Sequence, residues 1–86
     1  MKQNQVVERA KQVKARHEKM LMQLPNVVGV GVGFKEKEGQ WTDQIAIVVN
    51  VRKKIPLADL SAEDVVPLHL DDIVTDVQEV GEIKAL

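Results

Sequence analysis

The sequence predicts an α+β fold, in which a long N-terminal helix packs on a small, mainly antiparallel sheet of about three strands. Three observations lead to this expectation. Residues 5–23 contain neither Gly nor Pro, residues 28–34 alternate strictly between apolar residues and glycines, and residues 44–52 are rich in β-branched side chains. Because 86 residues and 9.6 kDa allow only one modest core, we expect a single domain over residues 1–86.

The first element is a helix over residues 5–23. Its apolar side chains recur at spacings of three and four, which places them on one stripe. Asn4 is a candidate N-cap, and Pro25 cannot continue the helix, so the helix should end near Gln23. The stripe consists of Val6, Ala10, Val13, His17, Met20 and Leu24.

The first strand is expected over residues 27–35, and its two faces differ sharply. Val28, Val30, Val32 and Phe34 share one face, whereas Gly29, Gly31 and Gly33 share the other. A strand face without side chains lets a neighbour approach closely, and the N-terminal helix is the nearest candidate. The sequence therefore predicts that these glycines are close-packing residues and that Gly31→Val overpacks the helix.

The second strand, residues 44–52, completes an antiparallel hairpin after a polar connection over residues 35–43 with Gly39 as its turn residue. Ala46 and Val48 are apolar on the face opposite the larger side chains, so this strand should be buried on both sides. The larger side chains are Ile45, Ile47, Val49 and Val51.

The last third of the chain predicts a short connecting helix and a third strand. Ser61 is suited to cap a helical turn that carries acids at its start, and Pro67 ends it. Residues 73–80 form the strand and Gly81 stops it. Residues 82–86 are expected to be a linker-like tail.

Composition and charge exclude several function classes. The chain has no Cys, which rules out disulfides and thiolate chemistry, and no apolar run approaches the ~20 residues that span a bilayer. The net charge is −1, but residues 1–24 carry +4 and residues 55–86 carry −7. The two ends can attract each other within one chain or between chains. The basic helix also suggests nucleic acid or an anionic surface, although base-stacking aromatics are scarce.

Each pattern that suggests catalysis or ligand binding has a simpler structural explanation. The glycines of residues 29–33 lie inside a strand, whereas a dinucleotide site needs them between a strand and a helix. A serine triad of Ser61, His69 and Asp71 or Asp72 lacks the glycine elbow that exposes a nucleophile. We expect no catalytic, cofactor-binding or metal-binding residue, and no enzyme.

Two further clusters have the same ambiguity. His69 with the acids beside it, and His17 elsewhere, would make a poor metal site, and a solvated acidic loop explains them. The basic run of residues 52–54 is explained by protection of a strand end. The alternative is a docking patch for an acidic partner.

The order of motifs resembles the N-terminal region of bacterial trypsin-like serine peptidases related to the plant narrow-leaf protein. The resemblance covers about residues 18–86 and includes Leu24-Pro25-Asn26, the valine–glycine run, Ile45 to Lys54, Val66-Pro67, Leu70-Asp71 and Thr75 to Leu86. In that family a small α/β segment precedes the peptidase domain. The catalytic residues of that domain match no position here, so the resemblance implies an accessory domain and transfers no activity.

The expected function is a non-catalytic accessory or interaction module, in the cytoplasm, without a cofactor. It would associate with itself, most simply as a dimer, or dock on a peptidase-like protein. A basic-helix binder of nucleic acid or an anionic surface is the alternative. One helix on a small sheet leaves apolar surface over, and such surface marks an interface. The interface candidates are Val28, Val30, Val32, Phe34, Ile45, Ile47, Val49 and Val51.

Overall fold

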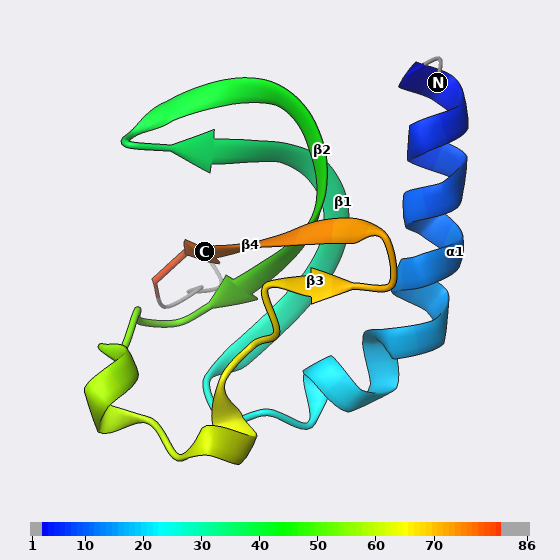
Figure 1. The fold of residues 1–86 in the computed structure, drawn as a ribbon. Helices are drawn as coiled ribbons and strands as arrows, with labels where there is room; N and C mark the ends of the chain where they lie inside the picture. Colours follow the sequence, from blue (N-terminus) through cyan, green and yellow to red (C-terminus); the bar gives the residue numbers. More distant parts are fainter. Residues whose placement is uncertain (1–2, 82–86) are drawn as a thin grey trace, which may run out of the picture.

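A computed structural model describes residues 3–81, which form one helix, a four-stranded mixed sheet and two short 3₁₀ turns (Figure 1). The predicted α+β class is therefore confirmed. The elements are α1 (Gln3–Met22), β1 (Val27–Lys37), β2 (Gln40–Val51), η1 (Leu57–Asp59), η2 (Ala62–Asp64), β3 (His69–Leu70) and β4 (Ile73–Glu79). The tail predicted over residues 82–86 lies outside the described residues.

The sheet order is β1-β2-β4-β3. β1 and β2 are antiparallel, and so are β3 and β4, but β2 and β4 are parallel. The sequence prediction missed β3, because two residues carry no periodic signal. It also missed the parallel pair, because β4 returns beside β2 only after the long connection of residues 52–68.

The hairpin of β1 and β2 is longer than predicted. Its loop consists of Glu38 and Gly39, whose φ angles of 53° and 78° fit the two-residue turns that match strand twist. Gly39 is thus the turn residue that the sequence predicts. The remaining residues of the predicted connection, 35–37 and 40–43, extend the two strands.

The core lies between α1 and one face of the hairpin. Ala10, Val13 and Leu21 of α1 are fully buried. They belong to one cluster with the alternate residues of β2 and with the β3–β4 hairpin, and Val30 and Val32 of β1 pack against this cluster. Leu21, rather than the expected Met20, continues the helix stripe, and Met20 is exposed. Asn4 lies inside the helix and does not cap it.

The helix covers the valine face of β1, and the prediction that it packs on the glycine face is wrong. Gly31 pairs with Val48 and Gly33 with Ala46, so the glycines face away from the cluster that holds α1. A Cβ added at Gly31 would have no atom within 4 Å, so the predicted overpacking by Gly31→Val is wrong as well. The physical reason is that the larger apolar side chains supply more contact area for the helix.

The proposed interface is corrected by the same arrangement. Ile45, Ile47, Val49 and Val51 are buried, and only Phe34 among the eight candidates is exposed. Val28, Val30 and Val32 are half-buried. These residues form much of the core beneath α1, so they do not make an exposed patch. The expected burial of β2 on both sides is confirmed, since Ala46 and Val48 are buried too.

The glycine face is the inner side of a strongly curled sheet. Figure 1 shows β1 and β2 bending together, with α1 on their convex side. The far end of β1 comes within reach of β4. There the Lys35 ammonium donates to the carbonyl of Thr75 at 3.1 Å, and the Asp76 carboxylate accepts from the amide of Glu36 at 2.9 Å. The glycines leave this inner face with little side-chain bulk, and an added Cβ would be crowded only at Gly33, where it would lie 3.3 Å from Val48 Cγ2.

Candidate functional site

The connection between β2 and β3, residues 52–68, builds a hollow with a largely apolar lining. Pro56 and Pro67 interrupt the regular structure, and the segment forms only the turns η1 and η2. Ser61 stands at the N-cap of η2, as predicted, but its side chain makes no capping hydrogen bond. No residue of either turn is buried in the core. Ile55, Leu57 and Leu68 are therefore left at the surface, whereas Leu60, Val65 and Val66 are half-buried.

Both ends of the connection are tied to the sheet. At its start, Asn26 adopts a φ of 76° and its side-chain amide bonds both the amide and the carbonyl of Lys53. The amide of Lys54 donates to the Glu79 carboxylate at 2.7 Å. At its end, the Thr75 hydroxyl donates to the carbonyl of Pro67. These bonds hold the segment as a wall opposite the sheet.

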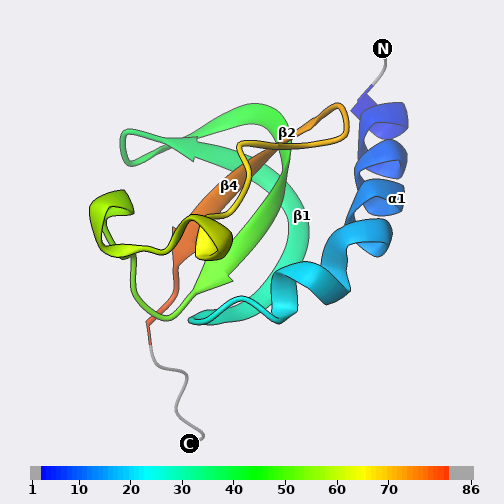
Figure 2. The ribbon, with the colours of Figure 1, turned by 60° about the horizontal axis from the view of Figure 1, so that its bottom comes forward.

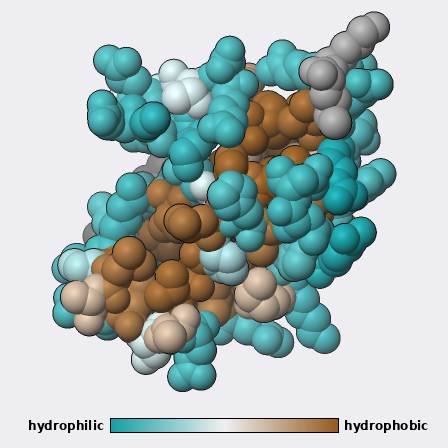
Figure 3. Space-filling view, in the orientation of Figure 1, coloured by the Kyte–Doolittle hydropathy of each residue, from teal (hydrophilic) through white to brown (hydrophobic). Residues whose placement is uncertain are grey.

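The hollow between this wall and the sheet is a groove of about 560 Å³, which we call the linker groove. That volume lies in the range of ligand pockets. Val27, Val51 and Val77 form its floor from three strands, and the connection forms its wall with Ile55, Leu57, Leu60, Val65, Val66 and Leu68. Figure 3 shows the corresponding apolar surface at the lower left, where Figure 1 places the two turns (see also Figure 2). Leu57 is 72% exposed and Leu68 is 81% exposed.

Some charged residues of the linker groove are paired with each other, and others have no ion-pair partner among the described residues. Lys35 and Asp76 lie 4.0 Å apart across it and compensate each other. Lys53 and Lys54 line one end, and their side chains are exposed with no ion pair among the described residues. Asp64 lines the connection side. The end formed by the predicted basic run of residues 52–54 is therefore the part that suits an acidic group.

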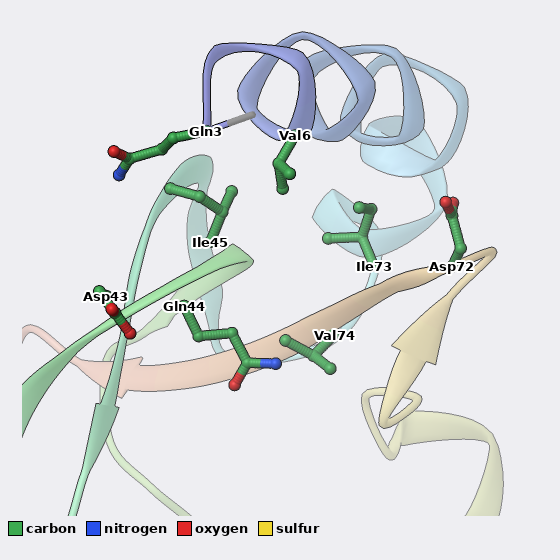
Figure 4. A pocket seen from close by; sticks show the side chains of 8 residues that line it. All are labelled: Gln3, Val6, Asp43, Gln44, Ile45, Asp72, Ile73 and Val74. Carbon is green, nitrogen blue, oxygen red and sulfur yellow. The ribbon is translucent and has the colours of Figure 1, made fainter. Parts of the chain in front are cut away.

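A second hollow, of about 430 Å³, lies between the start of α1 and the strands (Figure 4). Val6, Ile45 and Ile73 converge at its centre, whereas Asp43 and Asp72 lie at opposite ends. Asp72 is already paired with Arg9 at 2.9 Å. The polar groups do not converge on one point, so this hollow does not form a site for a polar ligand.

The inner face of the curled sheet holds a third, shallow hollow. It is lined by Gly33, Phe34, Trp41, Val48 and Gln78, and Trp41 is 67% exposed. Gly33 has little free space, because a Cβ there would lie 3.3 Å from Val48 Cγ2. The three glycines thus do not share one role: Gly33 is close-packed, whereas Gly31 is open.

The two acids of the hypothetical serine triad are occupied elsewhere. Asp71 accepts from Arg16 at 2.9 Å and lies 3.3 Å from His17 Nε2, and Asp72 pairs with Arg9. No hydrogen bond joins Ser61 to His69 among residues 3–81. In that range no group of three or more metal-ligating side chains gathers either. The structure thus gives Asp71 and Asp72 a role in holding the β3–β4 turn to α1.

The basic helix is largely compensated within the chain. Arg9 and Arg16 pair with Asp72 and Asp71, which are 63 and 55 residues away in the sequence. Lys11 pairs with Glu8, and Lys14 with Glu18. The hydrogen bond from Arg9 holds the pKa of Asp72 below its ordinary value of 3.8. The predicted attraction between the basic head and the acidic tail is therefore satisfied within one chain.

Comparison with protein families gives a clear result. The model of the NARROW LEAF 1 N-terminal domain matches residues 3–78, which is nearly the whole chain. This chain belongs to the NARROW LEAF 1 N-terminal domain family. The match confirms the narrow-leaf part of the resemblance seen in the sequence, and an N-terminal domain family is consistent with an accessory domain. No curated protein matched the chain. No helix among residues 3–81 combines the length and the apolar character needed to cross a membrane.

Proposed function

We propose that this NARROW LEAF 1 N-terminal domain is a non-catalytic accessory module that docks on another protein. The partner is a trypsin-like peptidase domain or a second copy of the chain. The observation that carries this proposal is the linker groove, whose exposed Leu57 and Leu68 lie beside a floor of valines. Exposed apolar surface next to a hollow marks protein–protein contact more often than chance, because leaving it in water costs free energy.

Two observations support docking over catalysis or binding through the helix. The two acids that could complete a triad, Asp71 and Asp72, are engaged in surface ion pairs that connect α1 with the β3–β4 turn. The same pairs reduce the positive charge that α1 offers to nucleic acid or an anionic surface. Binding of that kind would weaken steeply with salt, whereas apolar docking persists.

The test measures mass in solution. Sedimentation velocity is run on the chain alone and with a trypsin-like peptidase domain from the same genome, at high micromolar concentration. We expect either a dimer or a complex with the peptidase domain. The double variant Leu57→Asp/Leu68→Asp should remove that species, because it places charges in the apolar contact. Met20→Asp is the matched control, since Met20 is exposed on α1 and does not line the groove.

Two outcomes would contradict the proposal. One is a monomer of 9.6 kDa in both mixtures. The other is a complex that survives the double variant but dissociates at high salt, which would favour an electrostatic partner of the helix. A shift for the folded control alone would place the contact on α1.

A further inference from the structure

The linker groove has a property beyond its apolar lining: one of its walls is the unpaired edge of a β-strand. β3 pairs with β4 only at Ile73 and Val74. Next to them, the amide of Thr75 donates to the carbonyl of Leu68 at 3.0 Å, so Thr75 directs its backbone groups away from β2. The amide of Val80 donates to Val51, toward β2. Backbone groups alternate along a strand, so those of Val77 point to the same edge as those of Thr75.

Val77 therefore combines two kinds of contact in the groove. Its side chain belongs to the apolar floor, and its amide and carbonyl face the edge of β4 at which no described strand pairs with it. The carbonyl of Thr75 is already taken by Lys35. An extended peptide that pairs with Val77 and continues past Glu79 would gain main-chain hydrogen bonds, and its alternate side chains would enter the groove.

Charge indicates which peptide fits. Lys53 and Lys54 line the groove without an ion-pair partner among residues 3–81, and Arg52 adjoins them. The backbone of Lys53 and Lys54 is fixed by Asn26 and Glu79, so these side chains project from a held position. An acidic side chain of an incoming peptide would meet them at low cost in ordering.

We propose that the linker groove accepts an extended segment of a partner protein by strand addition to β4. The segment carries apolar residues at alternate positions and an acidic residue for Lys53 and Lys54. This proposal rests on the docking function proposed above and specifies its mode and the chemistry of the partner. Apolar contacts supply affinity, the strand edge demands an extended backbone, and the two lysines select for acid.

The probe is a synthetic peptide of about eight residues, which suffices to cover one strand. It alternates valine with threonine and has glutamate at two positions near one end. Binding is followed by amide chemical shifts of the isotope-labelled chain. We expect the largest shifts at Val77, Glu79, Lys53 and Lys54. The same peptide with lysine for glutamate should bind about tenfold more weakly, as expected for two lost exposed pairs.

Matched variants test the two parts of the proposal separately. Lys53→Glu/Lys54→Glu should weaken binding of the acidic peptide about tenfold and restore binding of the lysine peptide. Lys19→Glu on α1 is the charge control and should leave the affinity unchanged. A peptide with proline at its centre should bind at least about tenfold more weakly, because it cannot complete the strand pairing.

Three results would overturn the inference: equal binding of acidic and basic peptides, equal binding of the proline peptide, or shifts confined to α1 or to the glycine face. If decanoate binds as tightly as the peptide and causes no shift at Val77, the groove is an apolar pocket that binds without strand pairing. If the mass measurements show docking while these peptides fail, the proposed function stands and this mode of docking is wrong.

Discussion

The two faces of the β1–β2 hairpin solve different problems with the same strands. The convex face, beneath α1, is filled by large side chains such as Ile47 and Val49, which are fully buried in one continuous cluster. The concave face carries Gly29, Gly31 and Gly33 against Ala46 and Val48, which lie outside that cluster. The convex face therefore supplies most of the packing free energy. The concave face carries small residues, and it is the face toward which the sheet curls until β1 meets β4.

The largest expected difference between the two faces comes from replacing valine by alanine on each face of β2 in turn. Val49→Ala should lower the free energy of unfolding by about 2–3 kcal/mol, because it removes buried methyl groups and leaves a cavity under α1. Val48→Ala, one residue away and 8% exposed, should cost about 1 kcal/mol. Chemical denaturation at fixed protein concentration measures both. Equal costs would mean that the concave face contributes as much packing as the face under the helix.

A smaller effect separates two glycines of the concave face. Gly31→Ala should leave stability unchanged or raise it by up to about 1 kcal/mol, because its Cβ meets no atom within 4 Å and the unfolded chain loses freedom. Gly33→Ala should destabilise by about 1 kcal/mol, because its Cβ would lie 3.3 Å from Val48 Cγ2.

The double variant Gly33→Ala/Val48→Ala provides the internal check. Removing the Val48 methyl groups should relieve the contact. In denaturation experiments the double variant should therefore lose less stability than the sum of the losses of the two single variants. Strict additivity would show that the cost of Gly33→Ala does not come from contact with Val48.

The smallest effect concerns the ion pair between Arg9 of α1 and Asp72 of the β3–β4 turn. Since the pKa of Asp72 is lowered mainly by Arg9, the carboxylate contributes stability above its unfolded pKa, and this contribution is lost as the pH falls through the folded value. Arg9→Gln should therefore flatten the stability profile below about pH 4 and change little near neutrality. Lys11→Gln, on an exposed part of α1, is the control. An unchanged acid limb in Arg9→Gln would show that the pair does not act in solution.

The sequence predicts α1, the hairpin and β4 correctly, because each shows a regular spacing of apolar residues or ends at a Pro or Gly. Such signals depend only on neighbouring residues. Pro25 lies just beyond the end of α1, and Gly39 marks the turn. The choice of face for the helix was not predictable in this way. A run of glycines indicates a close neighbour, but the neighbour of Gly33 proved to be the Val48 side chain of the paired strand, and at Gly31 nothing lies close.

The candidate site was the least predictable part. Leu57 and Leu68 have no periodicity, and they belong to a segment whose backbone bonds run to Asn26, Thr75 and Glu79, far away in the sequence. The basic run of residues 52–54 was visible as a docking candidate. Its position beside an apolar groove and a strand edge depends on the parallel pairing of β2 with β4, which no local pattern encodes.

That parallel pairing has a consequence for how the chain is made. Residue Ile47 pairs with Thr75, so β2 must wait for the whole connection to be synthesised before its second edge is covered. Until then β2 is an apolar strand with one open edge, and pairing of such edges between nascent chains leads to aggregation. The domain should therefore fold late, with hairpin and helix assembled first and β4 added as the closing step. Chains that stop before residue 73 should accumulate as insoluble material even though they contain most of the core.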